Sequence, residues 1–215
     1  MKTFKFSAII VAIAFVFGGA TADAQMFSKD ATRTFKPSKE AKKEAKKMEK
    51  EGWGVSFGAM SMPEQIQRSY YFTNEIDNEG NAKYAIGHGR STAQYYDAAR
   101  LQAMQVARLD IAQQIETQLV AEAENVFGNE EGANAVTSVM QSTTGGRSYV
   151  SQCLKQTIIV TEIQRELPNG NKEVQVRIAA DRASVLDAAK KAISEDLKKR
   201  GGDIVNRLKE SGWDK

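Results

Sequence analysis

The side chains with the greatest capacity for chemistry lie in one short acidic stretch. Glu75, Asp77 and Glu79 alternate along the chain and precede Gly80, which matches the oxygen spacing and the glycine of the first half of a calcium loop. The bidentate acid that such a loop needs at its twelfth position would be Ile86. The pattern therefore favours a hairpin turn, and we predict no bound metal.

A glycine pair follows a few residues later. Gly87-His88-Gly89 is similar to the start of a nucleotide-binding loop, but the third glycine of that fingerprint would fall at Thr92. We therefore expect the glycines to let the N-terminus of a helix pack close to a strand, and we expect no cofactor. His88 is the single histidine, and only Asp77 and Glu79 accompany it as a candidate catalytic cluster.

A second chemical feature is a lysine-rich helical segment. The stretch Lys39–Glu51 consists of strong helix formers, and its apolar line is limited to Ala41, Ala45 and Met48. We expect a solvated spacer helix that ends at Gly52. Two alternatives stay open. The helix could dock on the domain or a partner through Met48, Trp53, Val55 and Phe57, or it could contact anionic surfaces through Lys39, Lys42, Lys43, Lys46, Lys47 and Lys50.

The first 24 residues predict the compartment. Lys2 and Lys5 precede an apolar run over residues 8–17, and Ala22-Asp23-Ala24 is a small-residue cleavage signal. We predict a secretory signal peptide that is cut between Ala24 and Gln25. The protein is then periplasmic or secreted, and a nucleic acid is not expected as its partner.

The single cysteine is either buried or free to pair between molecules. Cys153 cannot form an internal disulfide, and we expect it to be buried as a small hydrophobe. Because Gln25 and not a cysteine follows the cleavage site, we expect no lipid anchor, although peripheral membrane association stays open.

Residues 25–51 carry nine Lys and Arg against five Asp and Glu, so the net charge of +3 originates in this arm.

The remaining chain predicts one α+β domain over residues 52–215, after a disordered segment and the helical arm of residues 25–51. Ser61 and Pro63 predict a short helix that ends near Arg68. Two hairpins follow from extended runs around polar turns. Their strands are expected at residues 70–76 and 82–89, and at 156–167 and 173–179.

Helices separate and follow these hairpins. The longest is expected over residues 92–127, with a row at spacing four made of Ala99, Ala103, Ala107, Ile111, Ile115 and Leu119. A second helix is expected over residues 130–142, and Asp181 is expected to cap a final one. The predicted order is β-β-α-(α)-β-β-α, with an antiparallel sheet of about four strands and the helices on one face.

One stretch resembles a known family. Residues 84–89 followed by Asp97-Ala98-Ala99-Arg100 and the Ala103–Ile115 helix are similar to the LPP-twenty-type lipoproteins and to the related N-terminal domain of a flagellar outer-ring protein. The resemblance covers roughly residues 82–197. It implies a small α+β envelope domain that binds or scaffolds, with no catalytic residues to transfer. The missing lipidated cysteine departs from that family.

Three functions remain open at this point. The first is a non-enzymatic exported protein that acts through contacts with an unknown envelope protein or with the cell envelope itself. The second is an enzyme acting on cell-wall material through an unrecognised site, for which Asp77, Glu79 and His88 are the residues to test. The third is a binder of anionic surfaces that uses the six lysines.

Overall fold

The computed structural model describes residues 32–127 and 157–200, together with residues 137, 139, 154, 206 and 210. From Phe35 onward the chain belongs to one compact unit. The predicted signal peptide, its cleavage site at Ala24 and Gln25, and Cys153 lie outside the described residues, as does the helix expected at 130–142 apart from residues 137 and 139. Among the helices that are described, none has the length and apolar character needed to cross a bilayer.

The centre of the unit is a three-stranded antiparallel sheet. Its strands are β1 (Tyr84–Ala93), β2 (Ile158–Glu166) and β3 (Lys172–Asp181), and β3 lies in the middle. β2 and β3 form the predicted second hairpin around the turn at residues 168–171, and Val174, Val176 and Ile178 are buried at every second position of β3. The α+β class and the antiparallel sheet are therefore confirmed.

The predicted first hairpin is wrong. Its first strand is the end of helix α3 (Met62–Asn74), which begins with a capping box between Ser61 and Glu64. Phe72 lies on this helix, and its side chain is fully buried. The stabilisation gained by packing the helix therefore outweighs the preference of the neighbouring aromatic residues for a strand. A single bridge between Ile76 and Ala82 is all the strand pairing that the structure shows around that turn. Within the described residues the sheet therefore has three strands, a fourth is not confirmed, and the element order is α2-α3-β1-α4-β2-β3-α7.

Helix α4 (Tyr96–Phe127) covers one face of the sheet. The predicted row from Ala99 to Leu119 is fully buried and forms the main core with the inward residues of β3. The two glycines of β1 make this contact tight. A Cβ atom at Gly87 would lie 2.1 Å from the carbonyl oxygen of Ala107, and one at Gly89 would lie 1.9 Å from that of Ala103. The glycines thus allow close packing, but against the second to fourth turns of α4 and not against its N-terminus.

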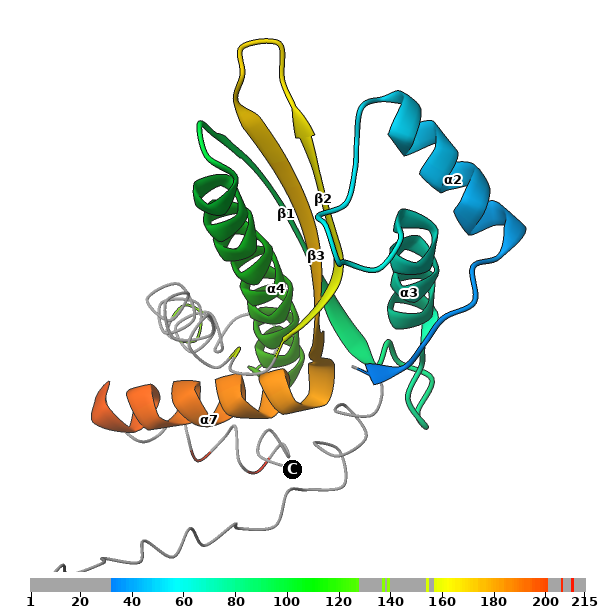
Figure 1. Cartoon of the computed structure of the whole chain (residues 1–215). Helices are drawn as coiled ribbons and strands as arrows, with labels where there is room; N and C mark the ends of the chain where they lie inside the picture. The colour runs from blue at the N-terminus through cyan, green and yellow to red at the C-terminus, as the bar shows by residue number, and fades with distance from the viewer. Residues whose placement is uncertain are drawn as a thin grey trace, which may run out of the picture. The chain divides into compact units, whose positions relative to one another are not determined.

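Helix α7 (Arg182–Arg200) completes the main core. Asp181 caps its first turn, as predicted, with a carboxylate oxygen 2.9 Å from the amide nitrogen of Ser184. Figure 1 shows α7 running across one end of the sheet, beneath α4. Its inner face contributes Val185, Ala189, Ile193 and Leu197.

The prediction that all helices lie on one face is also wrong. Helices α2 (Lys39–Lys50) and α3 lie on the face of the sheet that points away from α4, as Figure 1 shows. The second face is apolar enough to need a cover, because Ile163 of β2 and Tyr84 of β1 point toward it and are buried. The sheet is therefore the middle layer of three.

Candidate functional site

The lysine-rich helix α2 has defined ends. The side chain of Ser38 accepts a hydrogen bond from the amide of Ala41 at 3.1 Å, which caps the N-terminus. The helix ends where Gly52 takes a φ of +86°, a backbone conformation that favours glycine. The predicted bounds of this helix are confirmed within one residue.

One side of α2 is docked, so the expectation of a solvated spacer is wrong. Ala41 and Ala45 are 0% and 1% exposed. They pack in a small cluster with Trp53, Ile66 and Ile163, which joins α2 to α3 and β2. Small alanine side chains bury little area, but they let the helix approach closely enough for these larger neighbours to cover it. Of the residues proposed for docking, Trp53 is buried and Met48 packs against the cluster, whereas Phe57 is fully exposed.

The opposite side of α2 is a continuous cationic surface, which we call the lysine face. Its members recur every three or four residues, so the helical period brings them to one side. All are exposed, and none of their ammonium groups forms a hydrogen bond or an ion pair with any residue that the structure describes. The lysine face consists of Lys39, Lys42, Lys43, Lys46, Lys47 and Lys50.

The glutamates of α2 do not neutralise the lysine face. Glu44 is partly buried and accepts a hydrogen bond from the Tyr70 hydroxyl of α3. This bond, helped by burial, raises the pKa of the Tyr70 phenol above its ordinary value. Glu40 and Glu49 occupy the two borders between the docked side and the lysine face, by the 100° advance of each helical residue. The interleaved sequence therefore separates into faces once it is helical.

A small cavity lies behind α2. It is lined by Glu44, Met48, Gln65, Ile163 and Arg177, among others, and has a volume of about 10 Å³. A site of that size holds a single water molecule at most. This cavity is too small for a substrate. The side of α2 that faces the sheet therefore attaches the helix to the rest of the unit and forms no ligand pocket there.

A cluster around Trp53 fixes the C-terminal end of α2. Arg165 and Arg90 lie over the indole ring, with Cζ atoms 4.5 and 5.6 Å from its centroid. Both guanidinium groups also bind the buried carboxylate of Glu173, at 2.6 and 2.5 Å. Arg165 donates a further hydrogen bond of 3.1 Å to the carbonyl oxygen of Glu51, the C-cap of α2.

Burial raises the pKa of Glu173, but the hydrogen bonds from Arg165 and Arg90 lower it by more. The net pKa lies below the ordinary glutamate value. The group is therefore an anion at neutral pH and serves as the charged centre that joins β1, β2 and β3 to the end of α2.

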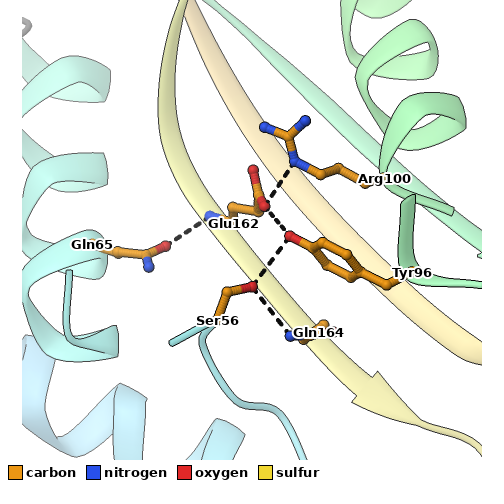
Figure 2. A network of polar contacts seen from close by, with 6 residues as sticks. All are labelled: Ser56, Gln65, Tyr96, Arg100, Glu162 and Gln164. Carbon is orange, nitrogen blue, oxygen red and sulfur yellow. Dashed lines mark hydrogen bonds and ion pairs between the residues drawn. The ribbon is translucent and has the colours of Figure 1, made fainter. Parts of the chain in front are cut away.

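A second polar network lies at the edge of β2 (Figure 2). The carboxylate of Glu162 accepts hydrogen bonds from the Tyr96 hydroxyl and from Nε of Arg100, the latter at 2.9 Å. Ser56 links the Tyr96 oxygen at 3.2 Å to the amide of Gln164 at 3.1 Å. Gln65 of α3 contributes a further bond, since its side-chain oxygen accepts from the backbone N–H of Glu162 at 2.7 Å.

This network has the groups of an acid–base site, but these groups form hydrogen bonds mainly with one another. Burial, followed by the hydrogen bond to Glu162, raises the pKa of the Tyr96 phenol, and the same carboxylate raises that of Arg100. Tyr96 thus stays protonated and Arg100 stays charged. The arrangement is suited to holding the start of α4 and the segment around Ser56 against β2, since one carboxylate oxygen of Glu162, Oε1, accepts from both Tyr96 and Arg100.

Asp77 and His88, which the sequence suggested as parts of one catalytic cluster, interact with different residues in the structure. Asp77 accepts hydrogen bonds from the amides of Glu79 and Asn81 at 2.9 and 2.8 Å, which makes an Asx turn and lowers the pKa of Asp77. His88 lies on β1 opposite Arg177 and is exposed. Desolvation, followed by the charge of Arg177, lowers the pKa of His88, so its imidazole is neutral at pH 7.

Metal ligation has no support in the described part of the chain. There, no three His, Cys, Asp or Glu side chains gather as a metal site requires. The acidic stretch from Glu75 to Gly80 forms a turn, but this turn follows α3 and does not join two strands of the sheet as predicted.

The sequence did not reveal the two polar networks. Glu162 meets Tyr96 and Arg100 across 66 and 62 residues, and no local pattern connects them. The available signal was weaker: Glu162 and Arg165 are charged residues inside a strand rich in β-branched residues, and a buried or half-buried charge needs a partner.

Comparisons of the chain with protein-family models, with curated proteins and with solved structures give no match. The resemblance to the LPP-twenty-type family therefore stays a prediction.

Proposed function

We propose that this protein is a non-enzymatic, exported binding protein that attaches to an extended anionic partner in the cell envelope through the lysine face of α2. The observation that carries the proposal is the separation of charge on α2. Six exposed lysines without partners among the described residues occupy one side, and the other side is docked on a structured body.

The shape of the lysine face favours an extended partner over a small one. Lysine side chains on the outside of a helix diverge from its axis, so they cannot converge on one phosphate as the donors of a pocket do. All six are lysines and none is an arginine, which suits diffuse attraction more than bidentate recognition. The face carries no aromatic residue on which a base could stack, which argues against single-stranded nucleic acid.

Long-chain polyphosphate is a suitable first probe. We define the α2 triple variant as Lys43→Gln, Lys46→Gln and Lys50→Gln. The matched α7 triple variant, Lys191→Gln, Lys198→Gln and Lys199→Gln, removes the same charge from exposed lysines of another helix. The α2 triple variant should bind polyphosphate much more weakly than the wild type, with little change for the α7 triple variant. Equal losses in both variants would show a response to net charge alone and would contradict the proposal.

No contact among the described residues specifically supports the enzyme hypothesis. Asp77 is engaged in its own turn, and the electrostatic partners of His88 are Arg177 and Asp110 and not Asp77 or Glu79. We therefore carry one proposed function forward.

A further inference from the structure

We infer that the partner of the lysine face is the surface of an anionic phospholipid bilayer, and that α2 binds it while remaining docked on α3 and β2. This inference rests on the proposed function and specifies its partner. It makes the protein a peripheral membrane protein that binds in one orientation and inserts no helix.

The apolar side of α2 is unavailable for insertion. An interfacial amphipathic helix places its apolar side, rich in large residues, below the lipid headgroups. In α2 that side consists mainly of Ala41 and Ala45, and the protein body already covers both. Two alanines would gain little from lipid, so electrostatic attraction must supply the affinity.

Three contacts keep α2 on the body along its length. At its start, the backbone N–H of Ser38 donates to the side-chain oxygen of Gln67 at 2.9 Å. In the middle, Glu44 accepts from the Tyr70 hydroxyl. At the end, Arg165 binds the carbonyl oxygen of Glu51. None of these contacts uses a lysine, so binding at the lysine face leaves them intact.

The geometry of the lysine face matches a flat partner. Twelve residues of helix extend about 18 Å. Along this length the cations lie on one side of a straight helix that forms the outer layer of the unit, as Figure 1 shows for α2 beyond α3. A bilayer with anionic lipids presents charge across such a plane, and 4–8 basic residues on one helix are typical of attachment to it. A flexible soluble polyanion needs no such plane.

The test compares vesicles of phosphatidylcholine with vesicles in which one third of the lipid is phosphatidylglycerol. The wild type should sediment with the anionic vesicles only, and raising the salt to about 1 M, where screening acts within about 3 Å, should release it. Because each lysine near such a surface contributes about fivefold, the α2 triple variant should lose about 100-fold in affinity. The α7 triple variant should lose less than about fivefold.

Trp53 reports whether α2 stays docked. It is 6% exposed beneath the end of α2, and Trp213→Phe leaves it as the sole tryptophan. Binding to anionic vesicles should leave its emission maximum unchanged. A shift of the maximum on binding would mean that the helix leaves the body, and would overturn the inference.

The other outcomes separate the two proposals. Binding to polyphosphate without binding to the anionic vesicles would overturn the bilayer inference and leave the proposed function standing. Binding to neither probe would overturn both.

Discussion

The two faces of the sheet are covered in opposite ways. On one face, α4 lies so close to β1 that Gly87 and Gly89 have no room for a Cβ atom, and the contact continues through a fully buried row to Leu119. On the other face, α2 and α3 rest on a small apolar cluster supplemented by polar contacts such as those of Gln65 and Glu173.

The difference separates stability from binding. The α4 face holds most of the buried apolar residues, so it should determine whether the unit folds. The α2 face buries much less and presents the lysine face outward, so it should determine what the folded unit binds. The following predictions test this separation, and they begin with the largest expected effect.

The strongest test is Gly89→Ala. Its Cβ would lie 1.9 Å from the carbonyl oxygen of Ala103, so the helix backbone must move away from the strand. We expect a loss of about 3 kcal/mol or more in the free energy of unfolding, measured by urea denaturation. Gly54→Ala on the α2 side is the matched control, because its Cβ would meet nothing closer than 4.0 Å. Similar losses in both variants would contradict the proposed difference between the faces.

Truncation of one isoleucine on each side gives the next effect. Ile111→Ala removes a fully buried side chain from the main core, and we expect a loss of about 3 kcal/mol. Ile66→Ala removes a side chain from the small cluster, where fewer neighbours surround the void, and should cost about 2 kcal/mol. Thermal unfolding measures both, and an equal or greater loss for Ile66→Ala would reverse the comparison.

These two sides were also unequally predictable from the sequence. The row in α4 follows from spacing alone, and the hairpin of β2 and β3 follows from β-branched runs around Pro168-Asn169-Gly170-Asn171. The α2 side was predictable only in part: the bounds of α2 follow from the sequence, but the full length of α3 does not. Tyr70 to Thr73 have residue types suited to a strand, and only the burial of Phe72 within the tertiary structure decides for a helix.

The candidate site was likewise predictable from the sequence only in part. The six lysines are visible in the sequence, and a helical period sorts them onto one side. Docking of Ala41 and Ala45 could not be predicted from the sequence, because it depends on contacts with Ile163 and Trp53 from other segments. The apolar line of α2 alone was too weak to predict it.

Acid should weaken the α2 side through Glu173. Because its folded pKa lies below the ordinary value, its interactions contribute stability that is complete above the unfolded pKa of about 4.3. This contribution is lost as the pH falls through the folded pKa. Glu173→Gln should cost about 2 kcal/mol at pH 7, since it leaves two arginines without their buried anion. The difference between variant and wild type should shrink below about pH 4.

Glu166→Gln controls for charge on the same hairpin. Glu166 pairs with Lys172 at the exposed end of the hairpin, so its removal should change stability little at any pH. If the unfolding free energy of Glu173→Gln followed the wild type in parallel from pH 7 to pH 3, the cluster around Trp53 would not be the acid-sensitive element.

The smallest expected effect tests whether binding at the lysine face requires α2 to be docked on the unit or only requires its charges. Ser38→Ala removes the N-cap of α2 without altering any lysine, and should cost about 1 kcal/mol. We expect the loss to appear as faster hydrogen exchange within α2 and not as a lower global stability, since α4 and the sheet carry the global value. If the lysine face must be held flat by the body, affinity for anionic vesicles should fall with this fraying. Unchanged affinity would show that the six charges suffice in any arrangement, and α2 would then be a cationic segment that the body carries but does not orient.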